Sequence, residues 1–201
     1  LIEKKGWPTR RARFCCSYLK EYKVKDRAVQ GIRRSESTAR AKRYKEPEIC
    51  RVYSAKEKVR VYLPILEWTD EDVARFIAER GVKCHPLYYD EQGNFHVERR
   101  LGCIGCPMRS DNGKADFKKY PKMLKAWIQR GKKYLDSHPQ SAAVRKFGTA
   151  YNMAYHNLFC HSYQEYLDKL APPLFAEHQL VTKDYLEEYF GIKLASIDKK
   201  E

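Results

Sequence analysis

QGIRRSESTARAKR, residues 30–43, is the stretch that decides the fold. The short, partly apolar run at 27–32 predicts a buried strand, and Gly31 near its end lets the backbone turn closely. Ser35 is a suitable N-cap residue, and good helix formers follow it. The stretch therefore predicts a strand, a tight turn and a helix in direct succession.

The same turn is a candidate anion-binding site. The N-terminus of a helix presents free backbone N–H groups, and guanidinium groups bind phosphate or sulfate oxygens through paired hydrogen bonds. Arg33 and Arg34 precede the predicted helix, and Arg40 lies one or two turns into it. Glu36 could orient one of these arginines, and Ser37 could donate a hydrogen bond from its hydroxyl. A basic, solvated helix without a ligand is the alternative interpretation.

Patterns further along the chain extend this picture. ICRVYS at 49–54 and KVRVYLPIL at 58–66 alternate in β fashion and predict two more strands. WTDEDVARFIAERG at 68–81 predicts a helix that Thr69 caps and Gly81 ends. One face of that helix carries an apolar stripe formed by Val73, Phe76 and Ile77.

The chain becomes mostly helical after a long loop. Residues 82–113 are rich in Pro, Gly, Asn and Asp and predict a loop. Amphipathic patterns at 114–135, 140–170 and 183–190 predict helices. Their aromatic residues favour a helix-packing core, with a partner surface as the alternative. These residues are Trp127, Tyr134, Phe147, Tyr151, Tyr155 and Phe159.

This order of elements predicts the fold class and the domains. A few strands followed by many helices indicate an α/β protein. We expect part of an α/β layer at residues 1–113 and a mostly helical extension at residues 114–201.

Composition indicates a globular protein with an anionic partner. The 201 residues include 40 Lys and Arg against 26 Asp and Glu, a net charge of +14. Such an excess favours a nucleotide or nucleic acid as partner, and a basic surface without a specific partner is the alternative. No run approaches the roughly 18 apolar residues of a membrane helix, and no signal peptide opens the chain. We therefore expect a cytoplasmic protein with no membrane partner. Because the chain begins at Leu1, we also expect a fragment that lacks its N-terminal part.

Four of the seven cysteines form two closely spaced pairs. The segment RARFCCSYLK holds Cys15 and Cys16, on a short helix predicted at 14–22, and RRLGCIGCPM holds Cys103 and Cys106 as C-x-x-C. Four thiolates from two such pairs suit either a tetrahedral Zn²⁺ ion or a [4Fe–4S] cluster. Four buried core thiols are the alternative.

The other three cysteines are single. Cys50 alternates within a predicted strand and is expected to be a core thiol. Cys84 and Cys160 each precede a histidine, but neither has a partner at a spacing that suits a metal site. An odd number of cysteines without a secretory signal favours metal ligands or free thiols over disulfides.

Five motifs follow one another between residues 7 and 110. Four of them are RFCCSYLK, an acidic helix led by Trp68, HPLY at 85–88 and the final G-C-x-x-C. The fifth is G-x-R-x-x-E-S-x-x-R, formed here by Gly31, Arg33, Glu36, Ser37 and Arg40. The motifs, in their order along the chain, resemble those of the sulfonucleotide reductase family, the phosphoadenosine and adenosine phosphosulfate (PAPS and APS) reductases.

The resemblance has implications for fold, substrate and cofactor. It implies a partial adenine-nucleotide alpha-hydrolase-like, Rossmann-like α/β layer. It implies that the arginine-rich turn, with Arg34, binds an adenine sulfonucleotide for reduction or sulfur transfer, and that a thioredoxin-like protein is the reductant. The paired cysteines resemble those of the iron–sulfur branch, where Lys20 would touch both the substrate and a [4Fe–4S] cluster beside it. The implied ligands are Cys15, Cys16, Cys103 and Cys106.

Two departures from the family leave the reaction open. The chain contains no Gly-Gly and so lacks the family's phosphate loop, and its tail, GIKLASIDKKE, lacks the cysteine that attacks sulfur in the reductases. No catalytic residue is assigned for this reason. We expect an enzyme in the full-length protein, and an inactive fragment without the loop. The alternatives are an enzyme of the same superfamily that modifies DNA or RNA with sulfur, and a zinc-stabilised nucleic-acid-binding module.

Overall fold

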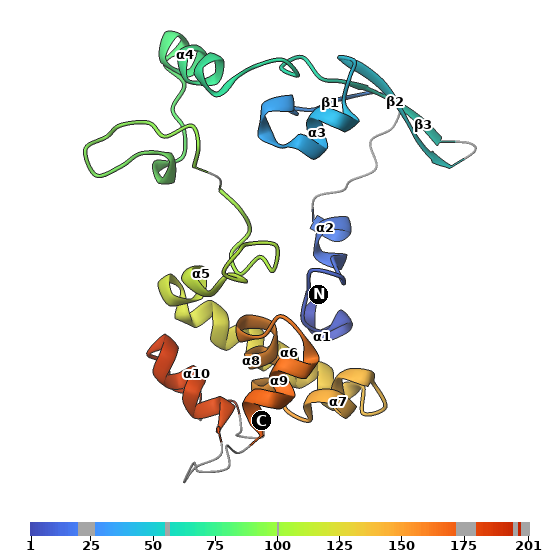
Figure 1. The fold of residues 1–201 in the computed structure, drawn as a ribbon, viewed down its shortest axis with the longest axis vertical. Coiled ribbons are helices and arrows are strands. Elements are labelled where there is room, and N and C mark those ends of the chain that lie inside the picture. The colour runs from blue at the N-terminus through green and yellow to red at the C-terminus, as the bar shows by residue number, and fades with distance from the viewer. Residues whose placement is uncertain (20–26, 55–56, 100, 172–179, 195–196, 198–201) are drawn as a thin grey trace. The chain divides into compact units, whose positions relative to one another are not determined.

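The computed structural model describes residues 1–19, 27–54, 57–99, 101–171, 180–194 and 197 (Figure 1). The chain divides into two compact units. Residues 22–102 form one unit, called here the α/β unit, and residues 1–21 together with 103–201 form the helical unit. This division differs from the boundary at residue 113 that the sequence suggested, because the N-terminal segment packs with the C-terminal helices.

The α/β unit contains a three-stranded sheet with strand order β1-β3-β2 (Figure 1). β1 pairs with β3 in parallel, and β2 pairs with β3 antiparallel. The mixed sheet confirms the α/β class. The elements of this unit are β1 (Arg27–Val29), a 3₁₀ turn (Arg34–Glu36), α3 (Thr38–Arg43), β2 (Glu48–Ser54), β3 (Glu57–Tyr62), α4 (Asp70–Arg80) and a second 3₁₀ turn (Pro86–Tyr88).

The core of the α/β unit lies on one face of the sheet. Val59 and Val61 alternate toward this face from the central strand and are buried, at 4% and 1% exposure. Apolar side chains beyond the strand complete the cluster, because a small sheet must cover its apolar face. The buried members are Tyr44, Val59, Val61, Leu63 and Leu66.

Three predictions within this unit are wrong. The strand at 27–32 is short and not buried, since β1 is an edge strand and Val29 is 72% exposed. Cys50 is exposed rather than a core thiol, because it pairs with Arg60 and shares the outer face of the sheet. The cap of α3 is Ser37, which accepts a hydrogen bond from the Arg40 backbone N–H at 3.2 Å, and not Ser35.

The structure confirms the helix predicted at 68–81 as α4. Thr69 and Asp72 form a capping box, and Gly81 ends the helix in a left-handed conformation with φ of 57°. The apolar stripe is less buried than its pattern suggests, since Phe76 is 42% exposed. Phe76 instead packs against the Trp68 ring at 5.3 Å.

The helical unit confirms the helices predicted in the second half, although breaks divide them. Pro121 starts a new helix after Tyr120, and the sequence around Gly148 separates two further helices. The elements are α1 (Ile2–Lys5), α2 (Phe14–Leu19), α5 (Lys114–Lys119), α6 (Pro121–Ser137), α7 (Ala142–Phe147), α8 (Ala150–Phe159), α9 (Tyr163–Leu170) and α10 (Thr182–Phe190).

The core of the helical unit forms where α6, α8 and α10 pack together. Leu124, Ile128 and Leu186 are fully buried there. The aromatic residues predicted as helix-packing core lie in or against this core or the adjoining cluster around Tyr166, as expected. The N-terminal segment belongs to the same core, because Trp7 is 6% exposed and packs against Trp127 at 5.2 Å.

His156 on α8 predicts a pH dependence of the unfolding free energy. Its Nδ1 is buried without a hydrogen-bond partner among the described residues. Burial, and next the Lys146 charge, lower the pKa of His156 below its ordinary value of 6.5, against weaker opposing effects of Asn157 and Glu165. Below about pH 6.5, His156 therefore binds a proton in the unfolded chain but stays neutral in the folded chain until the pH falls further. His156 should therefore lower the free energy of unfolding by up to about 1.4 kcal/mol for each pH unit, as the pH falls from about 6.5 toward the pKa of His156 in the folded chain.

Denaturant unfolding of the wild type and of His156→Phe between pH 7.5 and 5 measures this effect. The variant keeps a ring between Phe147 and Tyr166 but cannot bind a proton. Its stability should fall less steeply with acidification than that of the wild type. Parallel curves would show that the imidazole is not the group responsible.

Candidate functional site

The C-x-x-C loop is folded tightly against the core of the helical unit. The backbone N–H of Cys106 donates to the Cys103 carbonyl at 3.2 Å, which closes the turn. Gly105 within it has φ of +68°, and a Cβ at this position would overlap Cζ of Phe117 and lie 2.9 Å from its Cε2. Phe117 is fully buried. The glycine thus allows the turn to sit directly on the aromatic ring.

Asp116 fixes this loop, and Asp111 fixes the turn that follows it. Asp116 Oδ2 accepts a hydrogen bond from the Gly105 N–H at 3.0 Å, and Asp111 accepts from the N–H groups of Gly113 and Ala115 at 3.0 and 2.8 Å. Burial raises the pKa of Asp111, but these bonds and the nearby Arg109 outweigh it and leave that pKa lowered. Asp111 therefore fixes the turn at 111–115 in its charged form.

The predictions from the sequence did not include this frame, the backbone hydrogen bonds that Asp111 and Asp116 accept. The available signal was SDNG at 110–113, a turn sequence whose Asp111 can bond to the following backbone. Arg109 completes the frame with ion pairs to Asp111 and Asp116 at 3.4 and 3.5 Å.

The adjacent cysteines lie on α2, which confirms the short helix predicted at 14–22 as far as Leu19; residues 20–22 lie outside the described residues. The Cys16 N–H donates to the Arg13 carbonyl at 2.9 Å, and Arg13 Nη2 donates to Cys16 Sγ at 3.7 Å. Burial, and next the neighbouring Cys16 and Cys106 groups, raise the pKa of Cys15. The guanidinium at Cys16 provides a positive charge beside one of the thiols.

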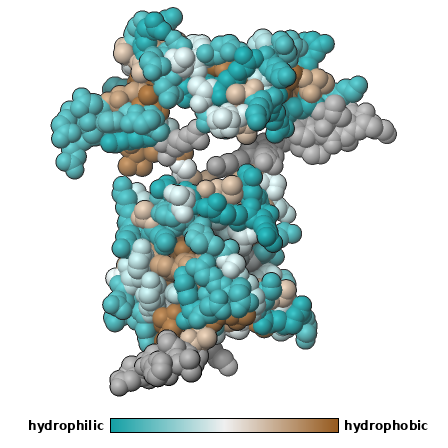
Figure 2. Space-filling model, in the orientation of Figure 1, coloured by the Kyte–Doolittle hydropathy of each residue, from teal (hydrophilic) through white to brown (hydrophobic). Residues whose placement is uncertain are grey.

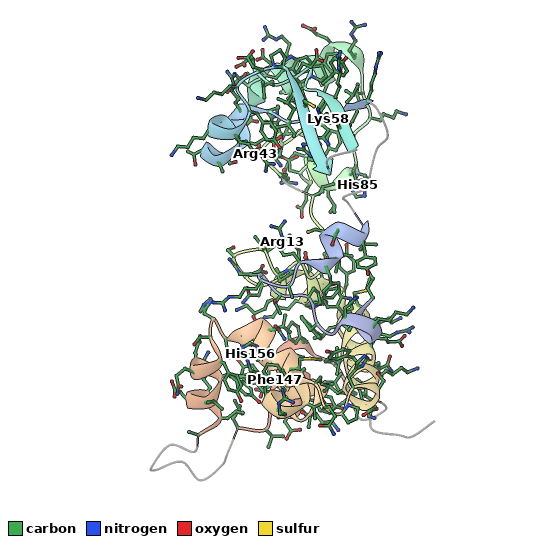
Figure 3. The ribbon with its side chains drawn as sticks, turned by 90° about the vertical axis from the view of Figure 1, so that its right-hand side faces the viewer. Arg13, Arg43, Lys58, His85, Phe147 and His156 are labelled. Carbon is green, nitrogen blue, oxygen red and sulfur yellow. The ribbon has the colours of Figure 1, made fainter. Side chains whose placement is uncertain are left out.

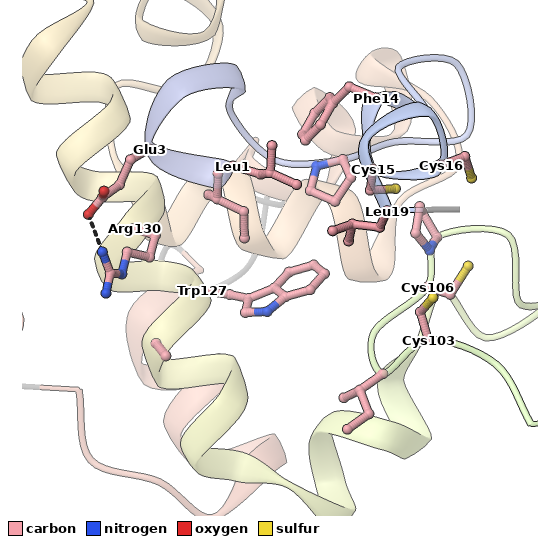
Figure 4. Close-up of a pocket in the computed structure, with 15 residues that line it drawn as sticks. Leu1, Glu3, Phe14, Cys15, Cys16, Leu19, Cys103, Cys106, Trp127 and Arg130 are labelled. Atoms are coloured by element: carbon pink, nitrogen blue, oxygen red, sulfur yellow. Dashed lines mark hydrogen bonds and ion pairs between the residues drawn. The ribbon is translucent and has the colours of Figure 1, made fainter. Parts of the chain in front are cut away.

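The two cysteine pairs line a single pocket of about 390 Å³ within the helical unit (Figure 4). None of the four cysteines is buried, so the alternative of four core thiols is wrong. Apolar side chains form much of the remaining wall, including Leu19, Ile104 and Trp127. The thiols therefore share a largely apolar, accessible cavity, called here the cysteine pocket.

The donor set of the cysteine pocket fits a soft, thiolate-bound centre. In the part of the chain that the structure describes, no three or more Cys, His, Asp or Glu side chains are arranged to hold a metal ion. The ligands of one zinc ion must converge to about 2.3 Å from a common point, whereas those of a cube occupy separate corners. Four cysteine thiols that line one cavity provide the soft donors that either centre uses.

The arginine-rich turn of the α/β unit is organised by carboxylates. Arg33, whose side chain is 13% exposed, pairs with Asp70 at 2.7 Å and with Glu36 at 3.7 Å. Arg40 pairs with the other oxygen of Glu36 and is 42% exposed. Glu36 thus lies between two guanidinium groups, in the orienting position expected of it.

Arg34 has a different environment from its neighbours. Its guanidinium donates to the Tyr44 carbonyl at 2.8 Å and to the Lys45 carbonyl, and it pairs with Glu67 at 2.6 Å. These contacts tie the turn to the segment after α3. Gly31 has no positive φ, and a Cβ there would make an ordinary 3.6 Å contact with Ile65. Lys20, the remaining predicted substrate residue, lies outside the described residues.

Comparison with known proteins decides the family. A sequence profile of the phosphoadenosine phosphosulfate reductase domain matches residues 3–109, more than half of the chain. The chain belongs to this family. Membership confirms the resemblance seen in the motifs, and the matched region includes both cysteine pairs and the arginine-rich turn.

Two relatives of this family member cover part of its length. An uncharacterized 37.8 kDa protein in the gpa 5′ region of Escherichia phage 186 is 35% identical over 116 residues, 51% of this chain and 32% of the relative. A phosphoadenosine 5′-phosphosulfate reductase of Alkalilimnicola ehrlichii is 31% identical over 74 residues, 35% of this chain and 27% of the relative. The chain thus spans about a third or less of these relatives.

Two negative findings accompany these matches. No solved structure matches the chain. Among the described residues, no helix has the length and apolar character needed to cross a membrane.

Proposed function

We propose that this PAPS reductase family member acts in an enzyme that binds an adenine sulfonucleotide and holds a [4Fe–4S] cluster. Family membership supports a nucleotide sulfate as the substrate class. The observation that carries the cluster is the cysteine pocket, in which Cys15 and Cys16 meet Cys103 and Cys106 from a distant part of the sequence. The bound cluster would supply an electrostatic and structural centre. The chemistry proposed for the substrate is reduction or sulfur transfer, and a thioredoxin-like reductant stays a prediction.

The arginine-rich turn is proposed to bind the sulfate or phosphate groups of the nucleotide. Arg33 and Arg40 are preorganised by Glu36 and Asp70, which limits the side-chain entropy lost on binding. Each guanidinium has five N–H donors, so one that already bonds carboxylates can still donate to an anion. Arg34 is proposed to act indirectly, by fixing the turn.

Analysis of iron, sulfide and zinc after anaerobic purification tests the cofactor. About four irons and four sulfides per chain are expected for a cube bound by cysteines. One zinc without iron would instead support a zinc-stabilised module. If the purified protein contains neither iron nor zinc, the proposal of a metal centre in the cysteine pocket is contradicted.

Replacing Arg33 or Arg40 by alanine should weaken binding of adenosine phosphosulfate or phosphoadenosine phosphosulfate. Loss of a hydrogen bond to a charged group costs about 1.5–3 kcal/mol, which corresponds to roughly 10- to 100-fold in Kd. Isothermal titration calorimetry of the wild type and of each variant measures this change.

Arg60→Ala is the matched control for these variants. It removes the same charge from the same unit, at a residue that is 65% exposed and only loosely paired with Glu48 at 3.7 Å. Circular dichroism verifies that each variant is folded. If the Arg33, Arg40 and Arg60 variants bind the nucleotide as tightly as the wild type, the anion site is not at this turn.

The charge of the chain supports a second candidate, an enzyme that modifies nucleic acid with sulfur. A net charge of +14 suits a polyphosphate substrate. Binding of duplex DNA that weakens steeply with salt, without sulfonucleotide binding, would favour this candidate over the first.

A further inference from the structure

A second cavity lies in the helical unit and shares Pro107 with the lining of the cysteine pocket. It has a volume of about 710 Å³, within the range of about 300–1,000 Å³ that is typical of small-ligand sites. Its walls come from the loop at residues 5–12 and from residues of α6, α7, α8 and α9. These helices follow the region that the family profile matches, whereas the loop at 5–12 lies within it. The cavity belongs to the helical unit, and the arginine-rich turn proposed to bind the sulfonucleotide belongs to the α/β unit.

The charged residues that line the second cavity are all basic. Lys5, Arg10, Arg11 and Lys146 contribute to its wall, and no aspartate or glutamate does among the described residues. Lys5, Arg11 and Lys146 are exposed, and none of the three pairs with a carboxylate in the part of the chain that the structure describes. Cations that lack carboxylate partners around a concave surface attract an anion.

The wider unit has the same sign of charge. Its sequence holds 22 lysines and arginines against 13 aspartates and glutamates, so it accounts for nine of the fourteen net positive charges. Figure 2 shows hydrophilic side chains over most of the visible face of this unit. An anionic ligand would approach along a favourable field.

Contacts with the protein hold the basic loop in place. Trp7 is buried in the helical core, and Gly6, at φ of +79°, brings the loop onto Tyr134, where an added Cβ would lie 3.1 Å from the ring. Arg10 Nη2 donates to the Arg109 carbonyl at 2.8 Å. The cations of this loop are therefore carried by an ordered segment, which reduces the entropy lost on binding.

Aromatic rings line the cavity beside these cations. Tyr134, Phe147 and Tyr163 are each half-buried. Phe147 and His156 lie next to each other in Figure 3, with ring centroids 4.9 Å apart, and the Lys146 Nζ lies 5.2 Å from the centre of the Tyr163 ring. A site that combines cations with partly exposed rings suits a ligand with both a phosphate and a planar base.

We propose that the second cavity binds a nucleotide unit. Lys5, Arg11 and Lys146 contact its phosphate, and the rings of Phe147 and Tyr163 contact its base. The same chemistry is present in a free nucleotide and in a single-stranded nucleic acid, and the test separates these two sources.

Fluorescence anisotropy with a labelled ten-residue oligothymidylate tests binding to the full chain. In the double variant Arg11→Gln/Lys146→Gln, affinity should fall roughly tenfold, and the slope of log Kd against log salt should fall by about one to two. Lys122→Gln/Lys193→Gln is the control, because it removes the same charge from exposed residues that do not line the cavity. Equal losses in the two double variants would overturn the proposal, since they would indicate unspecific attraction to a basic surface.

A second pair of variants tests the aromatic wall. Tyr163→Phe keeps the ring and should bind like the wild type, whereas Tyr163→Leu should bind several-fold to tenfold more weakly because one stacking surface is lost. Urea unfolding verifies that both variants are folded. Identical affinities for Phe and Leu at this position would overturn the assignment of the base to these rings.

Thymidine monophosphate distinguishes the two sources. If thymidine monophosphate displaces the oligothymidylate at a concentration similar to that of the oligothymidylate, the cavity is a site for a free nucleotide. If it does not displace the oligothymidylate, the cavity is a site for a strand. Absence of binding by both probes would overturn the proposal. Arg33→Ala should leave oligothymidylate binding unchanged, so failure of the sulfonucleotide assignment and failure of this one are separable.

Discussion

Replacing Cys103 by serine should abolish metal binding by this chain. A serine hydroxyl is not ionised near neutral pH and is a poor ligand for a soft metal, so the proposed cluster would lose one of its four thiolates. Iron should fall from about four atoms per chain to well below one, together with the visible absorption of a thiolate-bound cube. Metal analysis and the visible spectrum of the anaerobically purified variant measure the change.

Cys50→Ser is the matched control for this experiment. Its thiol is exposed on the outer face of the sheet in the other unit, and it does not line the cysteine pocket. The control should keep the full metal content. A Cys103 variant that also keeps it would show that Cys103 is not a ligand.

The prediction for Cys103 depends on a feature that the sequence alone could indicate. Both cysteine pairs are local patterns, and the chemistry of four thiolates in two such pairs suggests a common centre. The sequence could not establish that segments more than eighty residues apart line one pocket. That proximity follows from the packing of Trp7 against Trp127 and of Glu3 against Arg130 at 2.6 Å, which are long-range contacts.

Local signals predicted secondary structure well where a few neighbouring residues decide it. Thr69 caps α4 as expected, and Asp72, three positions on, completes a capping box. The cap of α3 was misplaced because Ser35 and Ser37 have the same chemistry. The choice between them follows from a contact outside the stretch, the hydrogen bond from Ser35 Oγ to the Trp68 carbonyl at 3.0 Å.

Burial was harder to predict from alternation alone. The pattern around Cys50 is compatible with either face of a strand, and the face is set by its pairing with Arg60 rather than by its own sequence. The anion site shows a similar limit. Arg33, Arg34 and Arg40 look equivalent in the sequence, yet Arg34 bonds backbone carbonyls while Arg33 and Arg40 share Glu36.

Replacing Gly105 by alanine should strongly destabilise the helical unit. At φ of +68° an L-residue costs about 1–2 kcal/mol. The new methyl group would also overlap the ring of Phe117, which is fully buried and cannot move away freely. Overpacking of this kind adds about 1–3 kcal/mol, so the total loss should be about 2–5 kcal/mol. Chemical denaturation of the wild type and the variant measures it.

Gly191→Ala separates the two causes of this loss. Gly191 also has a positive φ, 62°, and belongs to the same unit, but nothing lies within 4 Å of a Cβ built there. Its variant should lose only the backbone part, about 1–2 kcal/mol. The Gly105 variant should in addition lose metal, because the same overlap displaces the turn between Cys103 and Cys106 that Asp116 holds at 3.0 Å. Equal destabilisation of both variants, with full metal content in each, would mean that the contact between the loop and Phe117 fixes neither the stability nor the geometry of the cysteine pocket.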